Sequence, residues 1–497
     1  MKIGIVQTAA QTADFSNNLR AVVQGYRHCI DLGAEVVVAD AFALCGPCPG
    51  GLKERSSFLN QTQAALRALA AEIGSVPLFL GAYAPDPAAL PGEEFWEADG
   101  LLPETEPGGR EDGAVMLMPY LLEQDTVSVA LDETTVLENG LSLSASCDEE
   151  INAFGFQADL LAALPATPWY AGTETKNEDF LSWEAKQEGK PLICVRPAGS
   201  VDGNLWGGGS TVHAADGGVV ARLPLFEAAS CVVDTARPKP VPALPGTASL
   251  LRHALVMGLA DHVRRNGYEG VAVVLDGRPH VLLLAVLAAE ALSADHVVLL
   301  AREEPATDAR DVLEKAFLAE RLILLPGGSL PPIADSPDGV VEGNAGLPNI
   351  RLFMALAAHE AEKEGLMLLS SLCRGELLAG RDLELAAGTL LLPFGDLYEG
   401  DLRLLSAQME EEGRYVPSFA EFPDAPYEAA FQLLEDGNRS ATELLTQSEF
   451  PIDEAVLRKA QRLLVASAWK RRCLPPVLSF TAVENRRHYP AMHRLND

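Results

Sequence analysis

The sequence predicts an α/β protein of two domains, and three observations lead to that prediction. In the second half of the chain, apolar runs typical of buried strands alternate with helical patterns, which is the order of a doubly wound parallel sheet. The stretch 237–247 is rich in proline and typical of a semi-rigid linker. The length of 497 residues, with 48% hydrophobic residues, allows more than one full-sized core. We therefore expect domains at 1–236 and 248–497.

The first domain is expected to begin with a strand and to alternate strands with helices. Leu66, Leu69 and Ile73 recur at the spacing of one helix face, whereas the strands read as short runs of Val, Ile and Ala. Gly33 suits the end of the first helix. The region 93–112 is acidic and rich in Gly and Pro, which indicates a surface loop. The expected strands are 2–7, 35–39, 77–82, 140–146 and 191–196, the expected helices are 17–32, 61–73 and 159–164, and 211–218 is typical of a hairpin.

The second domain is expected to open with a helix, in which Leu251, Leu255, Leu259 and Val263 recur every fourth residue. Asn266-Gly267 is typical of its end. Strands and helices then alternate to about residue 371. The expected strands are 271–275, 296–301, 322–325 and 366–371, and the later helices are 308–320 and 349–362.

The central strand of the second domain leads directly into an apolar helix. In an α/β sheet, such a strand–helix turn binds nucleotide phosphates through free N–H groups and the helix dipole. A phosphate cradle uses several glycines and a hydroxyl, but this turn reads Asp276-Gly277-Arg278-Pro279-His280. Pro279 also lacks the N–H that a cradle would use. The turn therefore indicates a phosphate site whose own residues have been replaced, and we expect His280 to be structural.

Four segments of the first half, in this order, are similar to those of nitrilase-type amidases: 2–7, 33–38, 147–149 and 209–217. More narrowly, nearly the whole chain resembles the glutamine-dependent NAD+ synthetase family. The resemblance implies an α-β-β-α sandwich for the first domain. It also implies a site in which a Cys attacks an amide, a Glu accepts its proton and a Lys stabilises the developing charge.

The resemblance places two residues of this chain in that site. Cys147 holds the position of the nucleophile, and Ala41 occupies the position of the base. Asp40 is one residue away, and on a strand this turns it to the opposite face. No lysine lies between Lys53 and Lys176, so the cation is missing as well.

The second half resembles the pyrophosphate-loop ATPase part of the same family, whose fold is that of the adenine nucleotide alpha hydrolases. The resemblance implies ATP and Mg²⁺ as cofactors. It places nucleotide-binding positions at Asp276, Gly277, Arg278, Glu342, Arg374 and Glu376, most of which are substituted. The basic segments 470–476 and 486–490 are the most specific match. They are either a tail that packs on the acidic body or, by resemblance, a segment near a dinucleotide site or subunit interface.

Cys45 and Cys48 have the spacing of a thioredoxin-type redox pair. They follow a strand of nitrilase type instead of opening a helix, and Pro49-Gly50-Gly51 prevents an immediate helix. Three interpretations stay open. The two cysteines could exchange thiols, they could bind a metal, or their spacing in a loop could be a coincidence. The histidines show no ligand spacing with cysteine, and we expect no zinc site.

The formal net charge of −32 disfavours nucleic acids and anionic membranes as partners, because both are polyanions. No apolar run is long enough to span a membrane, and the first residues lack the apolar region of a signal peptide. Eight scattered cysteines do not form a disulfide framework. We therefore expect a cytoplasmic protein.

Three hypotheses for function follow. The first is a catalytically silent relative that acts as a binding, scaffolding or regulatory subunit, because groups that stabilise developing charge are missing from both sites. The second is a divergent but active glutamine-dependent NAD+ synthetase that uses glutamine, ATP and nicotinic acid adenine dinucleotide. The third is a module that senses a dinucleotide without turnover. The resemblance also implies a homo-oligomer, and a hetero-oligomer with an active synthetase stays open.

Overall fold

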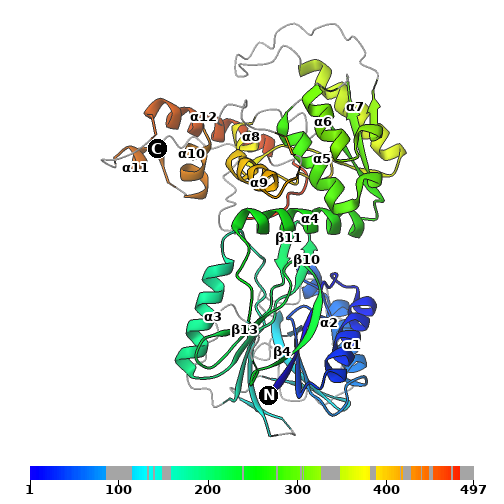
Figure 1. Ribbon diagram of the computed structural model, residues 1–497, viewed down its shortest axis with the longest axis vertical. Coiled ribbons are helices and arrows are strands. Elements are labelled where there is room, and N and C mark those ends of the chain that lie inside the picture. The colour runs from blue at the N-terminus through cyan, green and yellow to red at the C-terminus, as the bar shows by residue number, and fades with distance from the viewer. Residues whose placement is uncertain are drawn as a thin grey trace. The chain divides into compact units, whose positions relative to one another are not determined.

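Figure 1 shows the computed structural model of the chain. The chain divides into two compact units, the N-terminal unit (Met1–Leu244) and the C-terminal unit (Pro245–Asp497), which are described separately below. The structure describes residues 1–85, 115–130, 134–137, 140–147, 158–237, 240–275, 278–302, 305, 307–325, 347–380, 388–414, 416–417, 427–437, 439–446, 452–471 and 474–481.

The N-terminal unit contains two six-stranded sheets. The first has the order β14-β1-β2-β3-β4-β5 and the second the order β13-β12-β9-β8-β7-β6. The strands of the first sheet are β1 (Lys2–Gln7), β2 (Val36–Ala39), β3 (Leu78–Pro85), β4 (Val115–Glu123), β5 (Thr126–Val129) and β14 (Ala229–Asp234). Those of the second sheet are β6 (Thr135–Val136), β7 (Ser142–Ser146), β8 (Leu160–Ala163), β9 (Leu192–Cys194), β12 (Thr211–His213) and β13 (Val219–Arg222). A separate hairpin pairs β10 (Ala198–Val201) with β11 (Asn204–Gly207).

Three helices cover the outer faces of these sheets. Helices α1 (Phe15–Asp31) and α2 (Ser56–Ala70) cover the first sheet, and α3 (Glu174–Glu188) covers the second (Figure 1). Side chains alternate along β2, so that Val36 and Val38 join the core between the sheets while Val37 packs under α1 and α2. The layers are therefore helix, sheet, sheet, helix, and the predicted α-β-β-α sandwich is confirmed.

The prediction of a helix over 159–164 is wrong, because residues 160–163 form strand β8. This run of four apolar residues is fully buried and pairs in parallel with β7 on one side and β9 on the other. A short, wholly apolar run carries no periodicity that distinguishes a buried strand from a helix. Its neighbours in the sheet decide its conformation. The predicted hairpin over 211–218 is confirmed by the pairing of β12 with β13.

The C-terminal unit is built on a parallel sheet of order β17-β16-β15-β18. Its strands are β15 (Gly270–Val274), β16 (Val297–Ala301), β17 (Leu322–Leu324) and β18 (Leu366–Leu369), and its helices include α4 (Thr247–Arg265), α5 (Pro279–Leu292), α6 (Thr307–Lys315) and α7 (Leu347–Lys363). Helix α7 packs on the face that contains Ala272 and Leu300. Helix α5 packs against β15 and β16, and α4 packs on α5. The predicted doubly wound parallel sheet is confirmed.

Helix α6 ends five residues earlier than predicted. It stops at Lys315, and Phe317 then has a positive φ of 59°, which a continuing helix cannot contain. Residues 319–321 follow as a separate short turn of 3-10 helix. The periodic apolar pattern runs through this break, and so the sequence does not reveal it.

The remaining helices of the C-terminal unit are α8 (Arg374–Ala379), α9 (Glu399–Glu411), α10 (Glu428–Phe431), α11 (Ala441–Leu445) and α12 (Glu454–Arg471). All of these except α9 share an apolar core of their own. Helices α4, α5 and α9 are tied together by Arg252, which pairs with Glu290 at 2.5 Å and with Glu412 at 2.5 Å.

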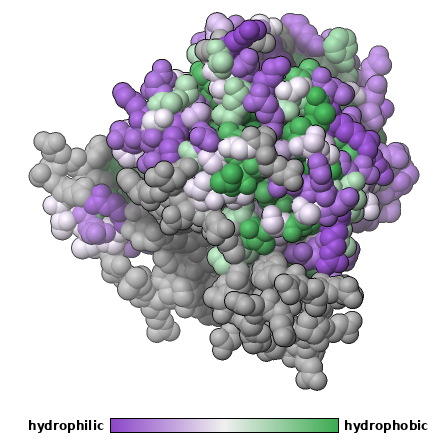
Figure 2. Space-filling view, turned by 90° about the horizontal axis from the view of Figure 1, so that it is seen from below, coloured by the Kyte–Doolittle hydropathy of each residue, from purple (hydrophilic) through white to green (hydrophobic). Residues whose placement is uncertain are grey.

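Among the described residues, no helix is both long and apolar enough to cross a membrane. Figure 2 shows one face of the molecule, on which hydrophilic residues form much of the border and hydrophobic residues gather toward the middle.

Candidate functional site

Ala41 and Cys147 lie at the carboxyl ends of two strands of the N-terminal unit. Ala41 is the second residue after β2, and Cys147 follows β7 directly. Both belong to the apolar core between the two sheets, where Ala41 is 0% and Cys147 is 7% exposed. The sequence therefore places these residues correctly at strand ends, and the core between the sheets holds both.

Asp40, next to Ala41, is fully buried, and its carboxylate accepts hydrogen bonds from the residues around it. One carboxylate oxygen accepts hydrogen bonds from the Thr8 backbone N–H and the Thr8 hydroxyl, both at 2.8 Å, and the other accepts from the Phe42 N–H at 3.0 Å. Burial raises the pKa of Asp40 to about 6, although these hydrogen bonds oppose the rise. The carboxylate therefore ties β1 to the turn after β2, and only the methyl group of Ala41 occupies the neighbouring position.

The turn at Ala41 lies directly against Gly81 of β3. A Cβ at Gly81 would lie 2.7 Å from the Cα of Ala41 and 2.8 Å from its carbonyl oxygen. We expect Gly81→Ala to lower the free energy of unfolding by ~1–3 kcal/mol, because backbone atoms must move to admit the methyl group. Urea denaturation of the two purified proteins measures this difference.

Gly74→Ala is the matched control for this prediction. Its Cβ would meet only the Tyr26 hydroxyl, at 4.0 Å, so we expect a change within ~0.5 kcal/mol. Equal effects of the two substitutions would show that the close approach of Gly81 to Ala41 does not matter.

The phenol of Tyr120 in β4 interacts electrostatically with the thiol of Cys147. It is 1% exposed, and its hydroxyl accepts a hydrogen bond from Gln63 at 3.2 Å. Burial and the nearby Cys147 raise the pKa of Tyr120 to about 12. At neutral pH this phenol is therefore a neutral hydroxyl, which supplies neither a base nor a cation. The alternation of β4 gives no signal in the sequence that would single out Tyr120.

Cys45 and Cys48 lie in a turn after β2. Burial raises the pKa of Cys45 to about 12 and that of Cys48 to about 11. The Cys48 sulfur accepts a hydrogen bond from Asn204 at 3.4 Å. Because thiol exchange requires the thiolate, these values disfavour a redox role at neutral pH. Within the described ranges, no group of three or more His, Cys, Asp or Glu side chains is suited to a metal ion.

In the C-terminal unit, Arg278 directly precedes α5, whose first residue is Pro279. The predicted succession of strand and helix around this turn is confirmed, whereas Asp276, Gly277 and Glu342 lie outside the described residues. The Arg278 guanidinium forms an ion pair with Glu376 and approaches the Ser371 hydroxyl at 3.5 Å. The other oxygen of Glu376 accepts from the Cys373 N–H at 2.9 Å and caps α8. Arg278 and Glu376 thus neutralise each other.

Arg374, a cationic candidate for the same site, is 6% exposed and paired with two carboxylates. Its guanidinium binds Asp396 and Asp436 and lies 5.7 Å from the centre of the Tyr398 ring. Burial works against its charge, but its neighbours raise the pKa of Arg374 on balance. The Arg374 guanidinium therefore joins α8 to the segments that contain Asp396 and Asp436.

Comparisons with known proteins show what this chain is similar to. No protein-family model matches the chain. The glutamine-dependent NAD(+) synthetase of Rhodobacter capsulatus is 27% identical over 68% of this chain and 70% of its own length. That of Synechocystis sp. is 24% identical over 80% of this chain and 77% of its own. The chain is thus similar in sequence to glutamine-dependent NAD+ synthetases.

Solved structures of such synthetases have the same fold. The Cytophaga hutchinsonii synthetase covers 99% of this chain with 98% of its own, at a TM-score of 0.77 and 12% identity. The Acinetobacter baumannii synthetase, solved in complex with ADP, has a TM-score of 0.69 and 16% identity over 99% of this chain and 98% of its own. The fold of this chain therefore matches that of these two structures over nearly the full length of each chain.

Proposed function

We propose that this relative of the glutamine-dependent NAD+ synthetases is catalytically silent and acts as a binding or regulatory subunit. The observation that carries the proposal is the turn after β2. A methyl group stands at the position of the base, and the adjacent carboxylate of Asp40 is held by Thr8 and Phe42. The position from which a base of the family type would activate Cys147 is thus chemically inert, and an unactivated thiol is a weak nucleophile near neutral pH.

The second site supports the same proposal. ATP binding needs cations and free N–H groups directed at the phosphates, and Mg²⁺ needs oxygen ligands. Here Arg278 is paired with Glu376 and Arg374 with Asp396 and Asp436. The described residues therefore do not fit ATP with Mg²⁺, and a phosphate would have to displace an internal carboxylate to reach either guanidinium.

A role in assembly agrees with one surface feature of the N-terminal unit. Phe180 and Trp183 lie one turn apart on α3, are 40% and 50% exposed, and have ring centroids 6.3 Å apart. Aromatic side chains are enriched in protein interfaces relative to the rest of the surface. The proposal includes a homo-oligomer, or a hetero-oligomer with an active synthetase, in the cytoplasm.

Glutamine hydrolysis and ATP–pyrophosphate exchange test the proposal on the purified full chain. We expect both rates to equal those of the buffer alone, because no described group stabilises the charge that develops in either reaction. Cys147→Ala is the matched variant, and we expect it to change neither rate. Turnover of glutamine that Cys147→Ala abolishes would contradict the proposal and favour a divergent, active synthetase. Binding of nicotinic acid adenine dinucleotide without turnover would favour the sensing role.

A further inference from the structure

Residues 240–244, here called the strap, are the last residues of the N-terminal unit, and Pro245 begins the C-terminal unit. The side chain of Leu244 is half-buried, whereas those of Pro242 and Ala243 are exposed. Leu244 lines a cavity whose other lining residues all belong to the N-terminal unit, Leu225 among them. The end of the proline-rich segment is therefore packed on that unit and is not free in solvent.

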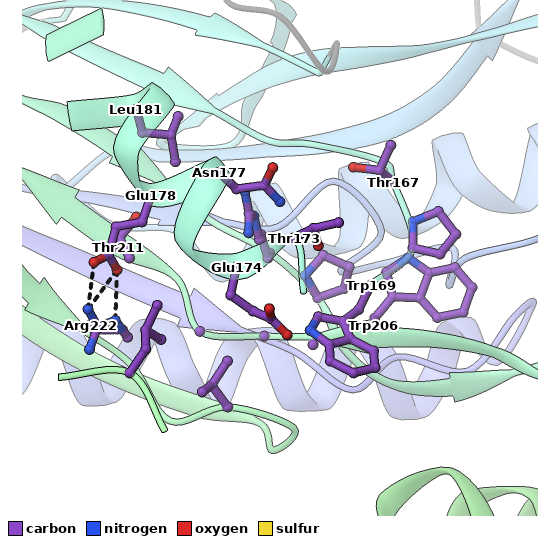
Figure 3. Close-up of a pocket in the computed structure, with 18 residues that line it drawn as sticks. Thr167, Trp169, Thr173, Glu174, Asn177, Glu178, Leu181, Trp206, Thr211 and Arg222 are labelled. Atoms are coloured by element: carbon purple, nitrogen blue, oxygen red, sulfur yellow. Dashed lines mark hydrogen bonds and ion pairs between the residues drawn. The ribbon is translucent and has the colours of Figure 1, made fainter. Parts of the chain in front are cut away.

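The cavity that Leu244 lines is small. It lies between the first turns of α3, the segment after β8 and the glycines at 207–209 (Figure 3). Its volume of about 40 Å³ equals the space of roughly three water molecules. Neither Ala41 nor Cys147 lines it. The strap therefore forms part of the wall of a cavity that is separate from these two residues.

Arg222 of β13 holds the strap by a hydrogen bond. Its Nη1 donates to the carbonyl oxygen of Pro242 at 2.5 Å. Glu178 of α3 accepts from the other two nitrogens of the same guanidinium, from Nε at 2.9 Å and from Nη2 at 2.7 Å (Figure 3). Because a guanidinium is planar and rigid, binding of two nitrogens by one carboxylate fixes the direction of the third. Glu178 thus orients Arg222 toward the strap.

The strap and the residues that follow it differ in how they are restrained. Proline fixes φ, so Pro240 and Pro242 lose little conformational freedom when the strap packs on the unit. The Arg222 and Glu178 side chains are only 12% and 20% exposed, which shields their ion pair from water. Pro245 and Gly246, by contrast, are exposed, and a Cβ added at Gly246 would meet no atom within 4 Å. The unrestrained part of the connector therefore follows the strap directly.

We propose that the strap opens and closes, and that Arg222 together with Leu244 holds it closed. In the closed state, only Pro245 and Gly246 remain as an unrestrained connector before α4. Opening adds the five residues 240–244, or ~17 Å of extended chain, to that connector. It also withdraws Leu244 from the cavity wall. The length of the connector and access to the cavity are therefore coupled, whether or not the family sites are silent.

Thiol labelling of the full chain tests the inference. Leu244→Cys and Ala243→Cys are made in separate proteins, and the protein without an introduced thiol gives the background from its own cysteines. We expect the Leu244→Cys thiol to react at least about fivefold more slowly than the Ala243→Cys thiol, because it is accessible only when the strap opens. Adding Arg222→Met to each protein should bring the two rates to within about twofold of each other, because the strap is then released.

Arg27→Met is the matched control, since it removes an exposed arginine that is paired with Glu72 in the same unit. It should leave the ratio of the two labelling rates unchanged, and circular dichroism verifies that each variant is folded. If Arg222→Met does not fold, Glu178→Gln takes its place, because it loosens the orientation of Arg222 and should lower the ratio. Equal rates at the two positions in the unmodified background, or an unchanged ratio in the folded variant, would overturn the inference.

Discussion

Asp396→Asn is expected to lower the free energy of unfolding by ~3–5 kcal/mol, the largest effect that the structure predicts for one substitution. Asp396 is 3% exposed and accepts hydrogen bonds from the Phe480 and Thr481 N–H groups, both at 2.8 Å, as well as pairing with Arg374. The amide of Asn has one acceptor oxygen in place of two and carries no charge. The NH2 group of Asn would face either the Arg374 guanidinium or the Phe480 and Thr481 N–H groups, so one of these two sets of donors would lose its acceptor.

Urea denaturation followed by circular dichroism measures this effect. Asp311→Asn is the matched control, because Asp311 is exposed on α6 of the same unit, and we expect it to change stability by no more than ~0.5 kcal/mol. A loss below ~1 kcal/mol for Asp396→Asn would mean that Arg374 does not depend on this carboxylate.

Asp40→Ala is expected to lower the free energy of unfolding by ~2–5 kcal/mol at pH 7. The substitution leaves the buried N–H groups of Thr8 and Phe42 without this acceptor. The turn that carries Ala41 would lose its tie to β1. Thermal and urea denaturation of both proteins measure the loss. Asp179→Asn serves as the control, because it changes an exposed carboxylate of α3 in the same unit.

The effect of Asp40→Ala should also depend on pH. Burial raises the pKa of Asp40 to about 6 in the folded protein, above its ordinary value of 3.8. Between these two values the folded state binds more protons than the unfolded state, so the contribution of Asp40 to stability falls as the pH rises from 4 through 6. We therefore expect the difference between the two proteins to be larger at pH 4 than at pH 7. The opposite trend would mean that the hydrogen bonds outweigh burial.

Much of the fold could be predicted because apolar patterns mark strands and helices locally. The strands at 2–7 and 271–275 and the helix at 251–263 are buried in the way that their patterns indicate. Strand β8 was missed because four consecutive apolar residues suit either a strand or a helix. The early end of α6 depends on one residue, Phe317, whose positive φ has no sequence signal.

The sequence predicts where the candidate site residues lie in the secondary structure, but it does not predict which side chains they contact. Ala41 and Cys147 lie at strand ends, as the segments around them indicate. The partners of Arg374, by contrast, lie 22 and 62 residues away, and no local pattern connects them. A cavity of the N-terminal unit is lined by residues between 167 and 244 that share no motif. Only the three-dimensional structure brings Glu174, Arg196 and Trp206 together.

The ion pair between Arg278 and Glu376 has a consequence for how this chain can evolve. If a hydroxyl residue typical of a phosphate loop replaced Arg278, Glu376 would be left as a largely buried carboxylate with no counter-ion, while it still caps α8. Such a substitution alone would therefore reduce the stability of the C-terminal unit. We therefore expect the effects of substitutions at Arg278 and Glu376 to be coupled, so that a change at Arg278 is tolerated best together with a change at Glu376.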